Sequence, residues 1–302
     1  MNEKQTLDTI IEEWLKIKKI TLKESTYYNY IFQINQYIKP YFKNIEMAEL
    51  EKFDLNLFVG DLMKVLKPSS LKNVIVLLKS ILEYSMKKYG YKFDFDFIAM
   101  PKVHKQEMKV LSAKEKSRLE KHCLENNTLR DIGIIICLNT GLRIGEICAL
   151  KWESIDLEKR SIKVKQTMQR VYNKVDKTSS IVIDTPKSDS SIRSIPISTK
   201  LYNILKPLKK KYSKNSYFLS GSAYTYIEPR NYQKMFKTLM KNCKIKDCHF
   251  HCLRHSFSTD CINVGMDAKS LSEILGHSDV RITLNRYVHS SISTKKKYLE
   301  KL

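Results

Sequence analysis

The chain has 302 residues, which is enough for about two domains. Its hydrophobic fraction of 42% indicates a globular protein with a substantial core, and it excludes a disordered or low-complexity chain. There are 54 Lys and Arg residues against 32 Asp and Glu residues, a formal net charge of +22. This charge favours a polyanion as partner, with DNA or RNA first, although a lysine-rich surface alone would also produce it.

The positive charge is concentrated in the second part of the chain. Residues 1–100 contain 15 basic and 13 acidic side chains, so the remaining residues contain 39 and 19. No arginine precedes Arg118. We therefore expect the polyanion to bind mainly to the C-terminal two thirds.

The sequence has no feature of an exported or membrane protein. The N-terminus, MNEKQTLDTI, lacks the apolar core of a signal peptide. Apolar runs such as Val74–Leu78 are far shorter than the roughly 20 residues that cross a bilayer. The seven cysteines are an odd number, which favours reduced thiols over a disulfide framework. We expect a cytoplasmic protein without a membrane partner.

Apolar residues recur at helical spacing through the first hundred residues. The pattern predicts helices at 6–18, 25–38, 54–65 and 69–88. Ser69 and Ser70 are candidate N-caps of the last helix. The periodicity fades near residues 91–97. We expect a helical first domain at residues 1–100 and a linker at residues 101–111.

The second domain, residues 112–302, begins with a capped helix at Ser112 and mixes helices with strands. The period changes to two at 161–167, 179–185 and 191–197. We expect these three segments to form one antiparallel sheet, with PKSDS as the hairpin turn between the last two. Further helices are predicted at 129–139, 201–212, 228–243, 252–264, 268–275, 280–287 and 294–302. The predicted fold is mostly α with a small antiparallel β-sheet.

Two segments of this domain place a cation in a turn. Thr140–Glu146 (TGLRIGE) places Arg143 between two helices and beside glycines, where it points into a cleft or lies on the surface. Lys187 lies in the predicted hairpin turn. A turn lysine has a long reach, but it is a solvated side chain unless other functional groups lie nearby.

The segment HCLRH combines a histidine and an arginine at helical spacing. His251 and Arg254 are three residues apart and share one helix face, so together they are suited to bind a phosphate. The alternative is a polar helix start with a solvent-facing arginine. Further along, His277 follows a glycine that ends a helix, and Tyr287 follows ten residues later.

Metal and nucleotide sites find little support. Six residues of metal-ligating types lie close together: Cys243, Cys248, His249, His251, Cys252 and Cys261. They lack the paired spacing of structural zinc sites, and the apolar neighbours Leu253 and Phe257 favour buried thiols at positions 252 and 261. There is no phosphate-binding G-x₄-G-K-[ST] loop. We expect no cofactor and no metal, so side chains alone would have to carry out any phosphodiester chemistry.

The order of these features resembles the tyrosine recombinase (phage integrase) family. The similar words are GLRIGE, HCLRHSF, LGHSD and RYVH, over about residues 112–290. The six catalytic positions of the family are all matched, by Arg143, Lys187, His251, Arg254, His277 and Tyr287. The resemblance implies an α+β catalytic domain, and the first domain is similar to the family's helical, SAM-like core-DNA-binding domain.

The resemblance implies DNA cleavage by a tyrosine, with a 3′-phosphotyrosyl link, a free 5′-hydroxyl and no need for ATP or metal. Tyr287 would be the nucleophile. His251 would be its general base, because a phenol with a pKa near 10 must lose a proton. Lys187 would protonate the departing 5′-oxygen.

The resemblance also assigns the residues that bind the phosphate. Arg143 and Arg254 would stabilise charge on the non-bridging oxygens, for which a planar guanidinium is better suited than an ammonium group. His277 would hydrogen-bond the scissile phosphate. Glu146, three residues after Arg143, is either a partner that orients this arginine or a carboxylate on the helix surface.

The family resemblance implies double-stranded DNA as partner, held between the two domains, and a homotetramer on two DNA sites. An accessory DNA-bending or directionality protein is compatible with such an assembly. The tail at residues 293–302 would dock on a neighbouring protomer, or else it is a frayed basic terminus.

Several functions share these motifs. GLRIGE favours an integrase of a phage or mobile element over an Xer-like resolvase of chromosome or plasmid dimers, which more often resembles GLRxSE. The first domain starts almost at Met1, which leaves no expected room for an arm-binding domain and keeps the Xer-like alternative open. A type IB topoisomerase uses nearly the same site. A DNA-binding protein without catalysis is disfavoured because the catalytic residues are complete.

Overall fold

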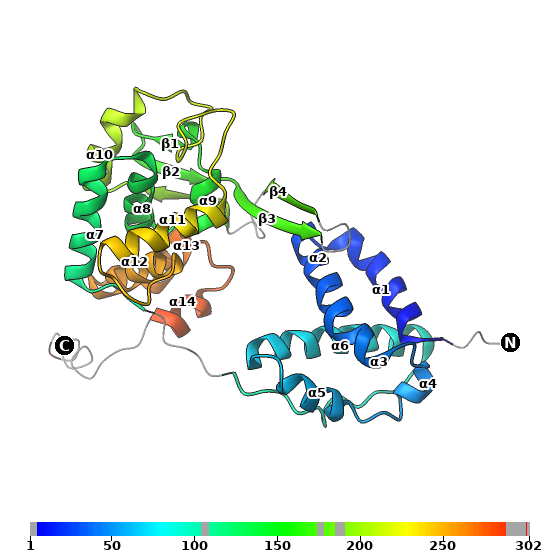
Figure 1. Cartoon of the computed structure of the whole chain (residues 1–302). Helices are drawn as coiled ribbons and strands as arrows, with labels where there is room; N and C mark the ends of the chain where they lie inside the picture. The colour runs from blue at the N-terminus through cyan, green and yellow to red at the C-terminus, as the bar shows by residue number, and fades with distance from the viewer. Residues whose placement is uncertain (1–4, 104–108, 174–177, 185–190, 288–299, 301–302) are drawn as a thin grey trace. The chain divides into compact units, whose positions relative to one another are not determined.

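The computed structural model describes residues 5–103, 109–173, 178–184, 191–287 and 300. The chain divides by its contacts into two compact units. One comprises Met1–Gln106 with Val171–Ser180, and the other Glu107–Arg170 with Ile181–Leu302. Figure 1 traces the helices and strands along the chain. No helix of the described residues is both long and apolar enough to cross a membrane.

The described part of the first unit consists mainly of helices. These are α1 (Leu7–Thr21), α2 (Glu24–Gln33), the π-helical turn η1 (Ile34–Ile38), α3 (Lys39–Phe42), α4 (Met47–Leu50), α5 (Leu55–Met63) and α6 (Pro68–Tyr89). Leu71, Val74 and Leu78 repeat at three- and four-residue spacing on α6, and all are buried. This face packs against α1 and α5 and forms the centre of the unit.

The four predicted helices of the first unit are confirmed, with two differences. The helix predicted at residues 25–38 is α2 continued through η1 into α3. Ser69 and Ser70 are not N-caps, because α6 begins at Pro68 with Lys67 in the N-cap position. Proline suits the first turn, where its fixed φ is helical and its missing N–H would have no partner in the helix.

The second unit contains the remaining helices and the three-stranded sheet. The helices are α7 (Ala113–Asn126), α8 (Leu129–Thr140), α9 (Ile144–Ala149), η2 (Trp152–Ser154), α10 (Thr199–Lys209), α11 (Pro229–Asn242), α12 (His251–Asn263), α13 (Ala268–Leu275) and α14 (Val280–Tyr287). The helices predicted from Ser112, at 129–139 and at five segments between 201 and 287 are confirmed as α7, α8 and α10–α14. The helix predicted at 294–302 lies outside the described residues, apart from residue 300.

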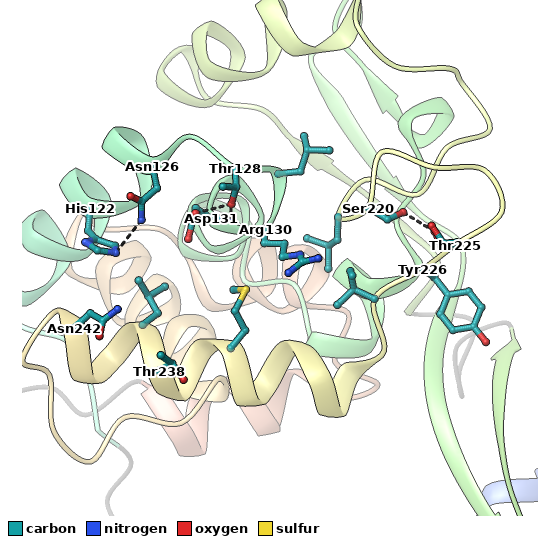
Figure 2. Close-up of a pocket in the computed structure, with 15 residues that line it drawn as sticks. His122, Asn126, Thr128, Arg130, Asp131, Ser220, Thr225, Tyr226, Thr238 and Asn242 are labelled. Atoms are coloured by element: carbon teal, nitrogen blue, oxygen red, sulfur yellow. Dashed lines mark hydrogen bonds between the residues drawn. The ribbon is translucent and has the colours of Figure 1, made fainter.

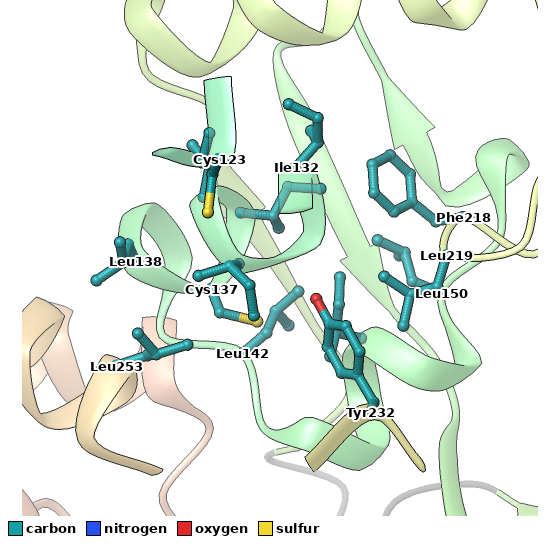
Figure 3. Packing of buried hydrophobic residues seen from close by; sticks show 14 of the residues in the cluster. Cys123, Ile132, Cys137, Leu138, Leu142, Leu150, Phe218, Leu219, Tyr232 and Leu253 are labelled. Atoms are coloured by element: carbon teal, nitrogen blue, oxygen red, sulfur yellow. The ribbon is translucent and has the colours of Figure 1, made fainter. Parts of the chain in front are cut away.

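Helix α8 forms the centre of the second unit. Ile132, Ile134 and Ile135 are fully buried although they point in different directions around the helix, so neighbours cover α8 on all sides. Helices α7, α10 and α12 pack against it. Figure 3 shows Tyr232 of α11 entering the same core, where its hydroxyl donates a 2.7 Å hydrogen bond to the Arg130 carbonyl. The first turn of α8 is therefore anchored to α11.

The strands form two sheets, so the predicted antiparallel sheet of 161–167 with 191–197 is confirmed, whereas the placement of 179–185 in that sheet is wrong. Strands β1 (Ile155–Asp156), β2 (Ser161–Val164) and β5 (Arg193–Pro196) form one antiparallel sheet in the order β1-β2-β5. Strands β3 (Thr167–Asn173) and β4 (Thr178–Asp184) form a separate pair. Alternation identifies a strand and its buried face, but it carries no information on the partner. The segment PKSDS lies outside the described residues.

Candidate active site

The loop that carries Arg143 is fixed by a glycine at the end of α8. Gly141 has φ +66°, in the left-handed region, and its N–H bonds to the Cys137 carbonyl and ends the helix. A Cβ at this position would lie 2.7 Å from Phe257 and 2.8 Å from Leu275. Only glycine therefore allows α12 and α13 to approach so closely.

Arg143 follows as the N-cap residue of α9, and Glu146 lies in the first turn of that helix. The guanidinium donates from Nη1 to Oε1 of Glu146 (2.8 Å), and the backbone N–H of Arg143 donates to Oε2 (2.9 Å). The Arg143 side chain keeps 36% of its surface exposed, whereas Glu146 keeps 2%. Glu146 is thus the partner that orients Arg143, and it does not lie on the helix surface.

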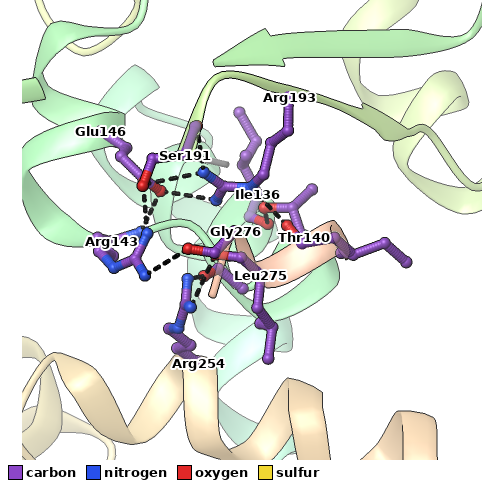
Figure 4. Close-up of polar contacts among 11 residues, drawn as sticks. Ile136, Thr140, Arg143, Glu146, Ser191, Arg193, Arg254, Leu275 and Gly276 are labelled. Carbon is purple, nitrogen blue, oxygen red and sulfur yellow. Dashed lines mark hydrogen bonds and ion pairs between the residues drawn. The ribbon is translucent and has the colours of Figure 1, made fainter. Parts of the chain in front are cut away.

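A second arginine, Arg193 of β5, binds the same carboxylate with two bonds. Its Nη1 and Nη2 donate to the two oxygens of Glu146 at 3.0 and 2.9 Å. Burial acts to raise the pKa of Glu146, but the hydrogen bonds and charge of Arg193, and then the charge of Arg143, lower it to about 2. The group is an ionised carboxylate between two cations (Figure 4).

Arg254 of α12 lies deeper than Arg143. Only 2% of the residue is exposed, and its Nη1 donates to the Gly141 carbonyl (2.8 Å) while Nη2 donates to the Leu275 carbonyl (2.8 Å). The alternative of a solvent-facing arginine is therefore wrong. Arg254 links the loop before Arg143 to the end of α13, two segments more than 100 residues apart in sequence.

Three guanidinium groups meet at the C-terminal end of α13. They donate to three successive carbonyls: Arg193 Nε to Ile274 O (2.5 Å), Arg254 Nη2 to Leu275 O (2.8 Å) and Arg143 Nη2 to Gly276 O (3.1 Å). The last carbonyls of a helix have no partner within it and form the negative end of its dipole. The arginines satisfy these carbonyls and are held close together despite their charge (Figure 4).

The histidines lie directly beside this cluster in sequence. His277 follows Gly276, and its Nδ1 lies 2.8 Å from Oγ1 of the buried Thr283, which fixes the orientation of the ring. His251 is the first residue of α12, one turn before Arg254. Its ring meets that of the buried His255 edge-on, with centroids 4.6 Å apart.

The structure does not describe the side chains of two of the six predicted catalytic residues. Tyr287 is the last residue of α14, but its side chain lies outside what the structure describes. Lys187 lies outside the described residues altogether. The structure brings Arg143, Arg254 and the segment before His277 together. The roles of all six remain predictions.

Arg193 is the residue of this site that the sequence analysis missed. Alternation alone predicts a strand at 191–197 and gives its arginine no role. Arg193 lies on the same face of β5 as Ile195, and both are buried, whereas Ser194 is exposed. An arginine at an inward-facing position of a strand needs a buried carboxylate as partner, which is the signal that could have identified it.

The cysteines and a cavity at the start of α8 take no part in this arginine cluster. Cys252 and Cys261 are buried, as predicted, and within the described residues no three metal-ligating side chains are grouped for a metal ion. A cavity of about 630 Å³ is lined, among others, by His122, Thr128 and Tyr226, which Figure 2 shows. It lies at the N-terminal end of α8, whose 12 residues span about 18 Å, whereas Arg143 follows the C-terminal end of this helix. It is therefore separate from the arginine cluster.

Comparisons with known proteins agree with this arrangement. A model of the phage integrase family matches residues 109–293, and a model of the phage integrase N-terminal SAM-like domain matches residues 6–63. The "tyrosine recombinase XerC-like" protein of Caldanaerobacter subterraneus subsp. tengcongensis is 25% identical over 313 residues, which covers 94% of this chain and 79% of that protein.

Solved structures share the fold over nearly the whole chain. The Tn1549 transposon integrase in complex with a circular intermediate DNA has a TM-score of 0.73 at 21% identity and covers 98% of this chain and 99% of its own. The lambda integrase tetramer bound to a Holliday junction has a TM-score of 0.68 at 15% identity, over 96% of this chain and 80% of that chain. With a family match over more than half of its length, this chain belongs to the phage integrase family of tyrosine-type site-specific recombinases.

Proposed function

We propose that the chain is an integrase of a phage or another mobile element, which cuts and rejoins double-stranded DNA through a 3′-phosphotyrosyl intermediate. The observation that carries the proposal is the arginine cluster. Arg143 is partly exposed, and the buried Arg254 connects its loop to the segment before His277. Donors fixed before the reaction stabilise a phosphorane-like transition state without having to reorganise.

Tyr287 is the proposed nucleophile. Its oxygen forms a bond to the phosphorus while the bond to the 5′-oxygen breaks, so a phosphodiester is exchanged for a phosphotyrosine ester. His251 accepts the phenol proton, and Lys187 donates a proton to the departing 5′-oxygen. Attack by a 5′-hydroxyl of the partner strand reverses these steps and rejoins the DNA. Because the ester bond energy is conserved, the exchange consumes no ATP.

The remaining residues stabilise the phosphate. Arg143 is the proposed donor to the non-bridging oxygens, since its two side-chain contacts engage two of its five N–H groups. Arg254 adds its charge from a buried position and holds the Arg143 loop in place. His277, with its ring oriented by Thr283, hydrogen-bonds the same phosphate.

The proposed organisation assigns residues 1–100 to DNA binding, 101–111 to a linker and 112–302 to catalysis. The exposed members of the 39 basic residues beyond position 100 supply salt-dependent contacts to DNA phosphates, and the proposed compartment is the cytoplasm. Four copies on two DNA sites are the proposed assembly, by analogy with the lambda integrase tetramer on its junction. An accessory DNA-bending protein is compatible with it.

An Xer-like resolvase is the second candidate, and the likeness to the XerC-like protein over 94% of the chain favours it. Gly145 in GLRIGE favours the integrase. A Cβ there would lie 2.5 Å from Oγ1 of Thr167 and 2.6 Å from the Met168 carbonyl, so the serine of GLRxSE would require β3 to move away from α9.

The test is a cleavage assay with supercoiled plasmid that carries the ends of the element surrounding the gene. The protein is added without metal or ATP, the reaction is stopped with detergent, and protein-linked DNA is mapped. We expect adducts at one defined site with recombinant products, and none with Tyr287→Phe at retained DNA binding. Scattered adducts with rapid relaxation would favour a type IB topoisomerase, and adducts at a chromosomal dimer-resolution site would favour the Xer-like function.

A further inference from the structure

Glu146 poses an electrostatic problem for the proposed site. Its ionised carboxylate lies 2.8 Å from Nη1 of Arg143, the arginine proposed to bind the phosphate. An isolated Arg–Glu pair has no net charge, so its attraction for a phosphate would be weak. A carboxylate so close to the reacting phosphate would also repel it.

Arg193 supplies the charge that resolves this problem. It forms two bonds to Glu146 and keeps only 6% of its side-chain surface exposed, against 36% for Arg143. Two guanidinium groups on one carboxylate leave a net charge of +1. Because Arg193 and Glu146 are buried together, this positive charge is presented to solvent through Arg143.

Arg193 also fixes the geometry from a third direction. Its Nε donates to the Ile274 carbonyl at 2.5 Å, and its Nη1 also donates to the Ser191 carbonyl at 3.0 Å. Strand β5 is thereby connected both to Glu146 and to the end of α13, which continues into His277. A shift of either segment would change the direction in which Arg143 points.

We propose that Arg193 is a positioning residue for strand cleavage, which neutralises and orients Glu146 so that the positive charge of Arg143 faces the scissile phosphate. The inference rests on the proposed function. Arg193 has no role in DNA binding in this proposal, because its guanidinium is buried among protein groups. Its loss should therefore slow the cleavage step and leave the affinity for DNA unchanged.

The experiment compares single-turnover cleavage and DNA affinity for wild type, Arg193→Met and Arg193→Lys. Arg193→Met should lower the cleavage rate about 10²-fold, because misplaced catalytic groups lose about that factor. Arg193→Lys keeps the charge without the two-bond geometry and should recover part of the rate. The stability control is Leu205→Ala on α10, a fully buried residue away from the cluster, which should lower the unfolding temperature but not the rate per folded molecule.

Two further measurements separate this role from a merely structural one. In Arg193→Met, adding Glu146→Gln removes the uncompensated negative charge, so the double variant should cleave faster than Arg193→Met alone. On DNA with a methylphosphonate at the scissile position, one non-bridging oxygen is a methyl group and the phosphate is neutral. The wild-type advantage over Arg193→Met should then shrink at least about tenfold, since less charge needs stabilisation.

The outcomes distinguish a failure of this inference from a failure of the proposed function on which it rests. If wild type forms tyrosine-linked DNA while Arg193→Met cleaves at the wild-type rate, only the inference is overturned. The same holds if the double variant is slower still and the methylphosphonate leaves the rate ratio unchanged. If wild type forms no adduct on any element end, both the proposed function and the inference are overturned.

Discussion

Helices α6 and α8 end with the same local device but in different surroundings. Gly90 after α6 and Gly141 after α8 both have positive φ, +80° and +66°, and both donate their N–H to the carbonyl four residues earlier. A Cβ on Gly90 would meet nothing within 4 Å, whereas on Gly141 it would overlap Phe257 and Leu275. The carbonyl of Gly141 also accepts a bond from Arg254.

A glycine that only ends a helix therefore differs from a glycine that also makes room for neighbouring helices. At Gly90 the glycine only allows the chain to turn, and Lys87 in the last turn is exposed to water. At Gly141 the turn, the packing of two helices and an arginine bond all depend on one missing Cβ. The four predictions below test this difference, starting with the largest expected effect.

Arg143→Ala should lower the rate of DNA cleavage about 10²- to 10³-fold, the usual loss when a single donor to a transition-state oxyanion is removed. Stability should change little, because this side chain is the most exposed member of the cluster. Single-turnover formation of the DNA adduct measures the rate, and thermal unfolding measures stability. Lys87→Ala, which removes a cation at the end of α6, is the control and should leave cleavage unaffected. An Arg143→Ala protein with wild-type cleavage would contradict the proposed role.

The unfolding free energy should depend on acid through Glu146. Its pKa is about 2 in the folded protein, below its ordinary value of 4.5. A lowered folded pKa contributes stability that is complete above pH 4.5 and is lost as the pH falls towards 2. The contribution amounts to about 3 kcal/mol.

Arg193→Met removes the strongest favourable partner of this carboxylate, so the variant should lose most of the contribution at neutral pH. Denaturant unfolding between pH 7 and pH 3 measures the effect. The stability difference between wild type and Arg193→Met should narrow as the pH falls. A difference that stays constant with pH would show that Glu146 is not the group coupled to Arg193.

The two helix ends also show which features can be predicted from sequence patterns and which cannot. Apolar periodicity predicts the helices in both units, because the buried face of a helix repeats in the sequence itself. Glycine and proline mark where helices end. Neither pattern indicates what lies against Gly141, because Phe257 and Leu275 approach it from helices more than 100 residues away.

Only part of the candidate site can be predicted from the sequence. The resemblance to a family assigned Arg143 and Arg254, and the structure places both at the end of α13. Arg193 was missed because alternation assigned its segment to a strand and gave no reason to ask which face the arginine occupies. The wrong placement of residues 179–185 in the sheet has the same origin, since alternation does not indicate that β4 pairs with β3.

Gly141→Ala should destabilise the second unit by about 2–4 kcal/mol. A left-handed alanine accounts for roughly 1–2 kcal/mol, and the overlap with Phe257 and Leu275 accounts for the remainder, as in an overpacked core. Because the Gly141 carbonyl would shift away from Arg254, cleavage should also slow. Chemical denaturation and single-turnover cleavage measure the two effects. A loss no greater than that at Gly90 would mean that the two helices move apart without penalty.

Gly90→Ala should have the smallest effect, about 1 kcal/mol, because only the left-handed backbone is penalised and no atom lies within reach of the new methyl group. Cleavage per folded molecule should be unchanged. The pair of variants isolates the tertiary part of the Gly141 effect, since both replace a C-terminal helix glycine by the same residue at similar φ. If both variants lose the same stability, the close packing around Gly141 contributes nothing and its conformation alone explains the glycine. If Gly141→Ala loses more, the excess measures how tightly α12 and α13 are held against the loop that presents Arg143.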